Sequence, residues 1–422
     1  MKSHLFARRL WTRDFVLILL VCTIASYPNS ILISLLPVYV LDLGGTNTWT
    51  GMMMTGLTLL GMVTNAVVAP LIDRVGRKKL LVLGSGLYAL NAAMFCLTED
   101  LTALFALRVL CGFTQGVFFP VPPIVAADNA PEDLMVDAMG LFGAAGSLAF
   151  AVTPTIGLFL YETFGPQVMF LSGAAMGTVS FVLSLFVTER YHRPQEAREE
   201  RERSSFRFDR AFVTMILLPS LVNFVVMFGN SAVQSFLTPC GLSRGIQQIS
   251  LFFLVNQGVV ILARLLVGRV LERFSKRACV LCGLWMTAGG TLLIAVAAHL
   301  PAMLVAAALL GLGQTAATQI LQAEVLLTSP ADRRGVAGTT YMLLGNIGGM
   351  GTGLWGAVSS AAGYGITYAL AGGATLLGWI FHGAYWGQRK RGEAPCKKAS
   401  PRPCQAATSQ LTDCKPGKRV IQ

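Results

Sequence analysis

Long apolar runs constrain the fold of this chain more than any other feature of its sequence. Twelve runs have about the length that a helix needs to cross the ~30 Å hydrocarbon core of a bilayer, which is roughly 20 residues. The runs are 15–40, 49–71, 80–97, 101–127, 138–161, 167–187, 212–237, 249–271, 278–299, 301–327, 338–362 and 365–386. We therefore predict an all-α membrane protein with twelve transmembrane helices.

The balance of apolar and charged residues excludes a water-soluble enzyme and a disordered protein. Hydrophobic residues make up 54% of the 422 and charged residues 13%, whereas soluble domains carry about 25% charge. Of the 33 Lys and Arg, thirty lie in the termini and in alternate loops, on one side of the predicted spans. This bias predicts that both termini and the central loop are cytoplasmic, and leaves no reason to expect nucleic acid as a partner.

One loop is long enough to divide the chain into two parts. We expect a cytoplasmic linker at 189–210, between a first six-helix bundle at 1–188 and a second at 211–387. Residues 388–422 mix Lys, Arg, Pro and Ser without periodicity, which predicts a disordered cytoplasmic tail.

The two halves repeat each other at a constant offset of 199 residues. AspArgValGlyArgLys at 73–78 aligns with GluArgPheSerLysArg at 272–277, and Gly112 aligns with Gly311. Several regions that share one offset indicate an internal duplication. A duplicated set of six helices is typical of secondary transporters, whose substrate site lies between the repeats near the middle of the membrane.

The repeated loop resembles the major facilitator superfamily. The superfamily signature Gly-x-Leu-Ala-Asp-Arg-x-Gly-Arg-Lys appears at 69–78, with Ala69 in place of the first glycine, and the copy at 268–277 restores that glycine. The resemblance covers residues 10–390 and is closest in kind to bacterial exporters of drugs or metabolites. It implies the superfamily fold of two pseudo-symmetric six-helix bundles.

Two further signatures lie within the spans. The fourth-helix signature Arg-x-x-x-Gly-x-x-x-Gly is intact at Arg108, Gly112 and Gly116. The antiporter signature Gly-Pro-x-x-Gly is partial, with only Pro154 and Gly157 in place. We expect these glycines and the proline to serve helix packing, because small residues let helices approach closely.

The resemblance also implies a charge network at the cytoplasmic ends of the helices. Asp73 would face the start of the eleventh span and Arg77 would pair with Asp128, because a carboxylate is stabilised by a helix amino terminus and an arginine by an acid. Such links would close the cytoplasmic side in the outward-facing state. The alternative is that the charges only anchor the loops. The predicted network consists of Asp73, Arg74, Arg77, Asp128, Glu272, Arg273, Lys276 and Glu324.

Polar residues on the first, fourth, seventh and tenth spans are the candidates for a substrate cavity, since the resemblance places these helices around it. The candidates are Asn29, Arg108, Gln115, Asn223, Asn230, Gln234 and Gln314. Each amide could instead form an interhelical hydrogen bond worth ~1 kcal/mol. Arg108 has no acidic partner in the sequence pattern, and neither does Arg264. Arg108 therefore either binds an anionic group of the substrate or influences the protonation of a distant acid.

These observations predict a secondary active transporter of the plasma membrane that moves a small organic solute by alternating access. Export is favoured, with H⁺ as a coupling ion carried by Asp128, Glu324 or the substrate. No protonatable acid lies in the first span, which favours a neutral or anionic substrate. The chain is expected to be a monomer and not an enzyme, without metal or cofactor. The alternatives are an uptake permease, a facilitated exchanger, or a sensor or scaffold that does not transport.

Overall fold

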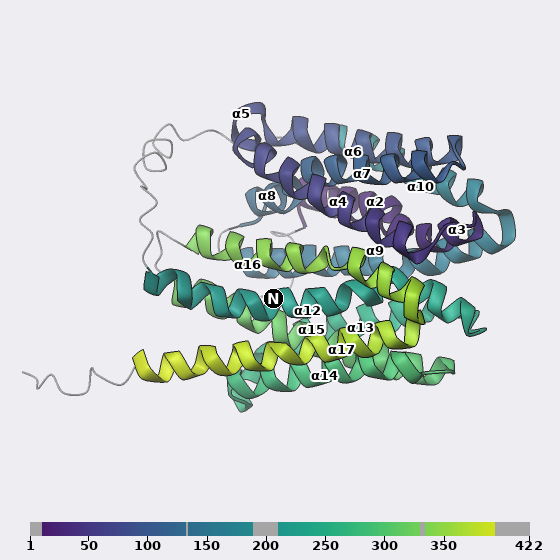
Figure 1. Cartoon of the computed structure of the whole chain (residues 1–422). Helices are drawn as coiled ribbons and strands as arrows, with labels where there is room; N and C mark the ends of the chain where they lie inside the picture. Colours follow the sequence, from purple (N-terminus) through teal and green to yellow (C-terminus); the bar gives the residue numbers. More distant parts are fainter. Residues whose placement is uncertain (1–10, 132–133, 189–209, 330–333, 393–422) are drawn as a thin grey trace, which may run out of the picture.

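The computed structural model describes residues 11–131, 134–188, 210–329 and 334–392, and every regular element there is helical (Figure 1). The predicted linker at 189–210 and the predicted tail at 388–422 lie outside the described residues, except for Arg210 and residues 388–392. Arg210 is the first residue of α12 (Arg210–Ser243), and residues 388–392 are helical because α17 (Thr352–Gly392) continues five residues beyond the predicted boundary at 387.

The first half of the chain forms six crossings. Their elements are α2 (Arg13–Ser34) with α3 (Leu36–Asp42), α4 (Asn47–Val68) with η1 (Ala69–Leu71) and α5 (Ile72–Val75), α6 (Arg77–Met94) with η2 (Phe95–Leu97), α7 (Leu101–Phe118) with α8 (Val121–Asp128), α9 (Met135–Phe164), and α10 (Pro166–Leu185). Pro37 and Pro122 stand in the first turns of α3 and α8, where a missing amide hydrogen breaks no helical hydrogen bond.

The second half repeats this arrangement with longer continuous helices. Its elements are α12 (Arg210–Ser243), α13 (Leu251–Arg273), α14 (Lys276–Val296), α15 (Leu300–Thr328), α16 (Arg334–Gly349) and α17. Figure 1 shows the helices of the two halves as two groups that lie side by side along a common direction.

Twelve crossings can be counted in the described residues. Ten stretches are long and apolar enough to cross a membrane, and Leu251–Arg264 is a shorter apolar stretch. One of the ten, Ala337–Gly387, has 51 residues and contains a sharp turn at Gly363 (φ 81°), so it crosses twice. Gly165 (φ 87°) makes the corresponding turn between α9 and α10. Glycine is favoured at both positions because side chains disfavour positive φ.

The two ends of the bundle differ in charge. We call the end that carries Arg77, Lys79 and Arg277 the basic end, and the opposite end, which carries Asn47 and Gly363, the far end.

Two helices that leave these ends are capped by side chains. Asp100 accepts the amide of Ala103 at the start of α7 (2.8 Å), and Ser275 accepts that of Ala278 at the start of α14 (3.2 Å).

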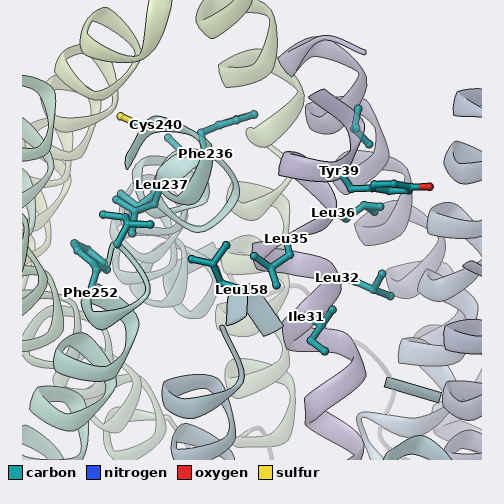
Figure 2. Close-up of a cluster of buried hydrophobic side chains, with 14 of the residues drawn as sticks. Ile31, Leu32, Leu35, Leu36, Tyr39, Leu158, Phe236, Leu237, Cys240 and Phe252 are labelled. Carbon is teal, nitrogen blue, oxygen red and sulfur yellow. The ribbon is translucent and has the colours of Figure 1, made fainter. Parts of the chain in front are cut away.

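Hydrophobic packing differs between the two ends. At the far end, one buried cluster contains residues of both halves, and Figure 2 shows Leu158 of α9 lying between Leu35, at the junction of α2 and α3, and Leu237 of α12. Toward the basic end, by contrast, each half has a cluster of its own. The first is centred on Phe15 and Leu81 and the second on α12, α14 and α15. The buried core therefore joins the halves only at the far end of the described chain.

Close contacts repeat the 199-residue offset in three dimensions. A methyl group at Gly112 would overlap the carbonyl of Leu57, and one at Gly311 would overlap that of Asn256. Both members of the second pair lie 199 residues after those of the first. In each half, the second and fourth crossings therefore pack against each other at an equivalent glycine. This equivalence supports two pseudo-symmetric six-helix bundles.

Candidate functional site

Two ion pairs lie at the basic end, one in each half. Arg77 of α6 donates a hydrogen bond to Asp128 at the end of α8, with side chains 11% and 25% exposed. Lys276 of α14 lies 3.8 Å from Glu324 of α15, whose side chain is 3% exposed. Each pair joins the start of the third crossing to the end of the fourth within one half. The ion pairs thus stiffen each half separately and do not join the halves.

The rest of the predicted charge network is only partly described. The side chains of Asp73, Arg74 and Glu272 lie outside the described part of the structure. Arg273 is exposed at the end of α13. The expected contact of Asp73 with the start of the eleventh crossing therefore stays a prediction, as does the role of the whole network as a gate.

Two of the predicted cavity amides form interhelical contacts. Asn223 of α12 donates to the carbonyl of Tyr341 on α16 at 3.0 Å, and Gln314 of α15 lies 3.9 Å from the sulfur of Met227. Such contacts fit the alternative interpretation, in which an amide holds helices together.

The side chains of the other four amide candidates form no hydrogen bond with the described residues. Asn29 and Asn230 are buried, Gln115 is half-buried and Gln234 is exposed. Asn230 and Gln234 are four residues apart, which places them on one face of α12. α12 packs against α2, the helix of Asn29. The place of these four amides in a substrate cavity therefore stays a prediction.

The structure places Arg108 inside the packing of the first half. Its side chain is 0% exposed, and its Nη2 donates to the sulfur of Met54 on α4 at 3.3 Å. Nε and Nη1 have no hydrogen-bond partner in the described structure. Such a charge costs at least ~2.5–3.5 kcal/mol on insertion scales. In this conformation Arg108 does not reach the space between the halves, so direct contact with a substrate would need a rearrangement.

The signature glycines and Pro154 lie at or near close contacts between helices. Methyl groups at Gly112 and Gly116 would overlap α4, and one at Gly157 would overlap Leu35 at the junction of α2 and α3. Pro154 is buried within α9. These contacts account for the small residues without a ligand.

A set of polar contacts joins the halves at the far end, which sequence reasoning missed. We call it the far-end latch; it consists of Asn47, Thr48 and Thr55 on α4 and Gly353, Ser359, Ser360 and Tyr364 on α17. Asn47 donates to Ser359 at 2.9 Å and accepts from Tyr364 at 3.1 Å. Thr48 donates to Ser360 at 3.0 Å. Serine and threonine are common in membrane helices, so the sequence held no clear signal for the latch.

Arg264 of α13 lies outside the predicted set of site residues. Its Nη1 donates to the carbonyl of Gly143 at 3.3 Å and to the hydroxyl of Ser147 at 3.4 Å, both on α9. Arg264 therefore lies at a contact between the two halves. The presence of an arginine in an apolar span is the sequence feature that points to this contact.

Among the described residues, no group of three or more His, Cys, Asp or Glu is placed to hold a metal ion.

Relatives are found among bacterial resistance proteins. Quinolone resistance protein NorA of Staphylococcus aureus (strain MRSA252) is 26% identical over 211 residues, which are 49% of this chain and 52% of the relative. Multidrug resistance protein 1 of Bacillus subtilis (strain 168) is 24% identical over 205 residues, again 49% and 52%. The chain thus spans about half the length of the curated relatives it matches.

Solved structures share the fold over most of the chain. A POT family transporter in complex with a thioalcohol-conjugated peptide has a TM-score of 0.76 at 12% identity, covering 89% of this chain and 96% of that one. A bacterial homologue of the human lysosomal transporter Spinster has a TM-score of 0.70 at 14% identity, covering 90% and 96%. The family profile of the Major Facilitator Superfamily matches residues 18–239 and 219–413. With its twelve crossings and duplicated motifs, this multi-pass membrane chain belongs to the major facilitator superfamily of transporters.

Proposed function

We propose that this chain is a secondary active transporter that exports a small organic solute across the plasma membrane by alternating access. Relatives named for quinolone and multidrug resistance support export, although each match covers about half of the relative. The basic end is then cytoplasmic, in agreement with the distribution of Lys and Arg. We propose a monomer, because one chain already supplies both bundles and the space between them.

The difference between the two ends of the bundle carries this proposal. At the far end, the shared hydrophobic cluster and the far-end latch hold the halves together. At the basic end, α5 and α8 pack against helices of their own half, and the clusters are separate. Two rigid halves that meet at one end and separate at the other form one of the states that alternating access requires. The conformation is therefore assigned as inward-facing.

Small residues allow the far end to close. A methyl group at Gly51 of α4 would overlap the carbonyl of Thr352, and one at Gly356 of α17 would overlap that of Asn47. Backbones of the two halves thus approach each other directly, in a contact that depends on glycine. Opening the far end separates these surfaces and breaks the hydrogen bonds of the far-end latch.

Crosslinking of the far end tests this proposal. In Thr48→Cys/Ser360→Cys the thiols replace hydroxyl oxygens that lie 3.0 Å apart, so an oxidant should join them. Transport of a fluorescent quinolone into inside-out vesicles should stop on oxidation and return on reduction. The two single variants, treated alike, control for oxidation elsewhere. Full transport by a crosslinked protein would show that the far end need not open.

The direction and coupling of transport are tested in the same vesicles. Export driven by protons predicts uptake of the quinolone when the vesicle interior is made acidic, and none without a gradient. Uptake that follows only the solute's own gradient would favour the facilitated exchanger. Movement of the quinolone out of loaded inside-out vesicles when the interior is made acidic would favour an uptake permease driven by protons.

A further inference from the structure

Arg264 points away from the lipid-facing side of α13. Leu262 and Leu266 are 58% and 45% exposed apolar side chains, as expected where a helix meets lipid. Arg264 is two residues from each of them, which places it about 200° around the helix from both. It is nevertheless exposed, and its described contacts are with α9 of the other half. Its exposed surface therefore faces the space between the halves.

Two nitrogens of the Arg264 guanidinium have no hydrogen-bond acceptor among the described residues. Nη1 donates to Gly143 and Ser147, while Nε and Nη2 form no hydrogen bond with any described residue. The ion pairs in the described structure are Arg77–Asp128 and Lys276–Glu324, so Arg264 has no acidic partner there. A guanidinium presents its donors in a planar fork that fits both oxygens of a carboxylate, sulfonate or phosphate.

The surroundings of Arg264 leave room for a ligand. A methyl group at Gly140 or Gly146 of α9 would meet no atom within 4 Å, so α9 is not tightly packed on either side of Gly143. Gln257 lies seven residues before Arg264, on the same face of α13 as a helix turns. It is half-buried and has no hydrogen-bond partner among the described residues. Arg264 is about 20 Å along α13 from its far end, near the depth expected for a transported solute.

We propose that Nε and Nη2 of Arg264, whose Nη1 is held by Gly143 and Ser147 of α9, bind the anionic group of the transported solute. The ligand class is an organic carboxylate, sulfonate or phosphate, entering between α9 and α13 from the basic end. The inference rests on the proposed transport function and assigns its substrate class. It also assigns the anion contact to Arg264, which lies between the halves, and not to Arg108, which is enclosed by the first half.

Charge-selective labelling of Ser147→Cys tests the site directly. The full chain in nanodiscs, with its native cysteines replaced, is treated with 2-sulfonatoethyl methanethiosulfonate and with its cationic trimethylammonium analogue. Arg264 should favour the anionic reagent. A unit charge about 6 Å away in water changes each rate about threefold in opposite directions, so Arg264→Gln should lower the anion-to-cation rate ratio about tenfold.

Two control variants accompany the test. Arg264→Lys keeps the charge and should keep most of the ratio. Arg108→Gln removes the other arginine within a span and should leave the ratio unchanged. An unchanged ratio in Arg264→Gln, or a thiol at position 147 that neither reagent reaches, would overturn the proposal.

Protection by ligands tests the substrate class. Millimolar 1-naphthoate or 1-naphthyl phosphate should slow labelling of the thiol at position 147, whereas uncharged 1-naphthamide should not. Equal protection by all three compounds, or protection by none, would contradict an anion site. Labelling requires no transport, so this result is independent of the crosslinking test. The anion site and the transport function can therefore fail separately.

Discussion

The Thr55 hydroxyl on α4 accepts a hydrogen bond from the backbone amide of Gly353 on α17, at 3.1 Å. Gly353 lies in the first turn of α17, where amides lack partners within their own helix. Thr55 therefore caps a helix of the other half, and also donates to the carbonyl of Met350 at 3.0 Å. When the halves separate at the far end, α17 loses this cap.

Thr55→Val should favour opening of the far end. Loss of a capping hydroxyl costs about 0.5–2 kcal/mol, which corresponds to a shift of roughly twofold to thirtyfold toward the open state. The native Cys240 reports this shift, because it is 0% exposed within the far-end hydrophobic cluster. A membrane-impermeant maleimide added from the far-end side should label Cys240 faster in Thr55→Val. Thr55→Ser keeps the hydroxyl and should label as the wild type does; equal rates in all three proteins would refute the capping role.

Gly51→Ala should shift the same equilibrium through packing. The added methyl group would overlap the carbonyl of Thr352 when the far end is closed. Opening of the far end relieves this overlap. Cys240 labelling should again become faster. Gly373→Ala on α17 is the matched control, because a methyl group there meets nothing within 4 Å. A faster rate in both variants would point to general loosening of the bundle.

Glu324→Gln tests where the coupling proton binds. If Glu324 carries the proton, the variant should lose transport driven by a pH gradient but keep exchange of labelled for unlabelled solute, since exchange requires no net proton movement. Asp128→Asn is the matched variant in the first half, because Asp128 forms the corresponding ion pair with Arg77. Gradient-driven transport that survives in Glu324→Gln and fails in Asp128→Asn would assign the proton to Asp128.

Arg244 should contribute to stability through the end of α14. Its guanidinium donates to the carbonyls of Ile294, Ala295 and Ala297, at 2.6, 3.0 and 2.7 Å. These carbonyls lie at a helix carboxyl terminus, where cations are favourable. Arg244→Ala should destabilise the second half by about 1–3 kcal/mol, with Arg244→Lys intermediate. Thermal unfolding in detergent measures the effect, and an unchanged midpoint in Arg244→Ala would show that water replaces the guanidinium fully.

The fold could be predicted from the sequence because bilayer thickness sets the length of each apolar run. The duplication was visible because the pair Gly112 and Gly311 supports the same helix contact in both halves. The pairing of Arg77 with Asp128 followed from the family signature. These features depend on local sequence or on motifs, which a single chain contains in full.

The direction in which a polar side chain faces could not be predicted in the same way. The side chain of Asn223 contacts α16 and that of Asn230 has no described partner, although the two residues are seven positions apart on one face of α12. Likewise, Arg108 is enclosed by the first half while Arg264 lies between the halves. The contacts of each side chain depend on which distant helix lies beside it at its depth, and tertiary packing decides that neighbour.

Paired distances at the two ends test alternating access most directly. Spin labels at Lys79→Cys and Ala278→Cys report the basic end, and labels at Glu99→Cys and Ala298→Cys report the far end. The two residues in each pair are 199 positions apart, and all four are exposed. Double electron–electron resonance in nanodiscs should give a short far-end distance at rest. On adding a transported solute, the far-end distance should lengthen while the basic-end distance shortens. If both distances stay fixed, or change in the same direction, the chain does not work by alternating access.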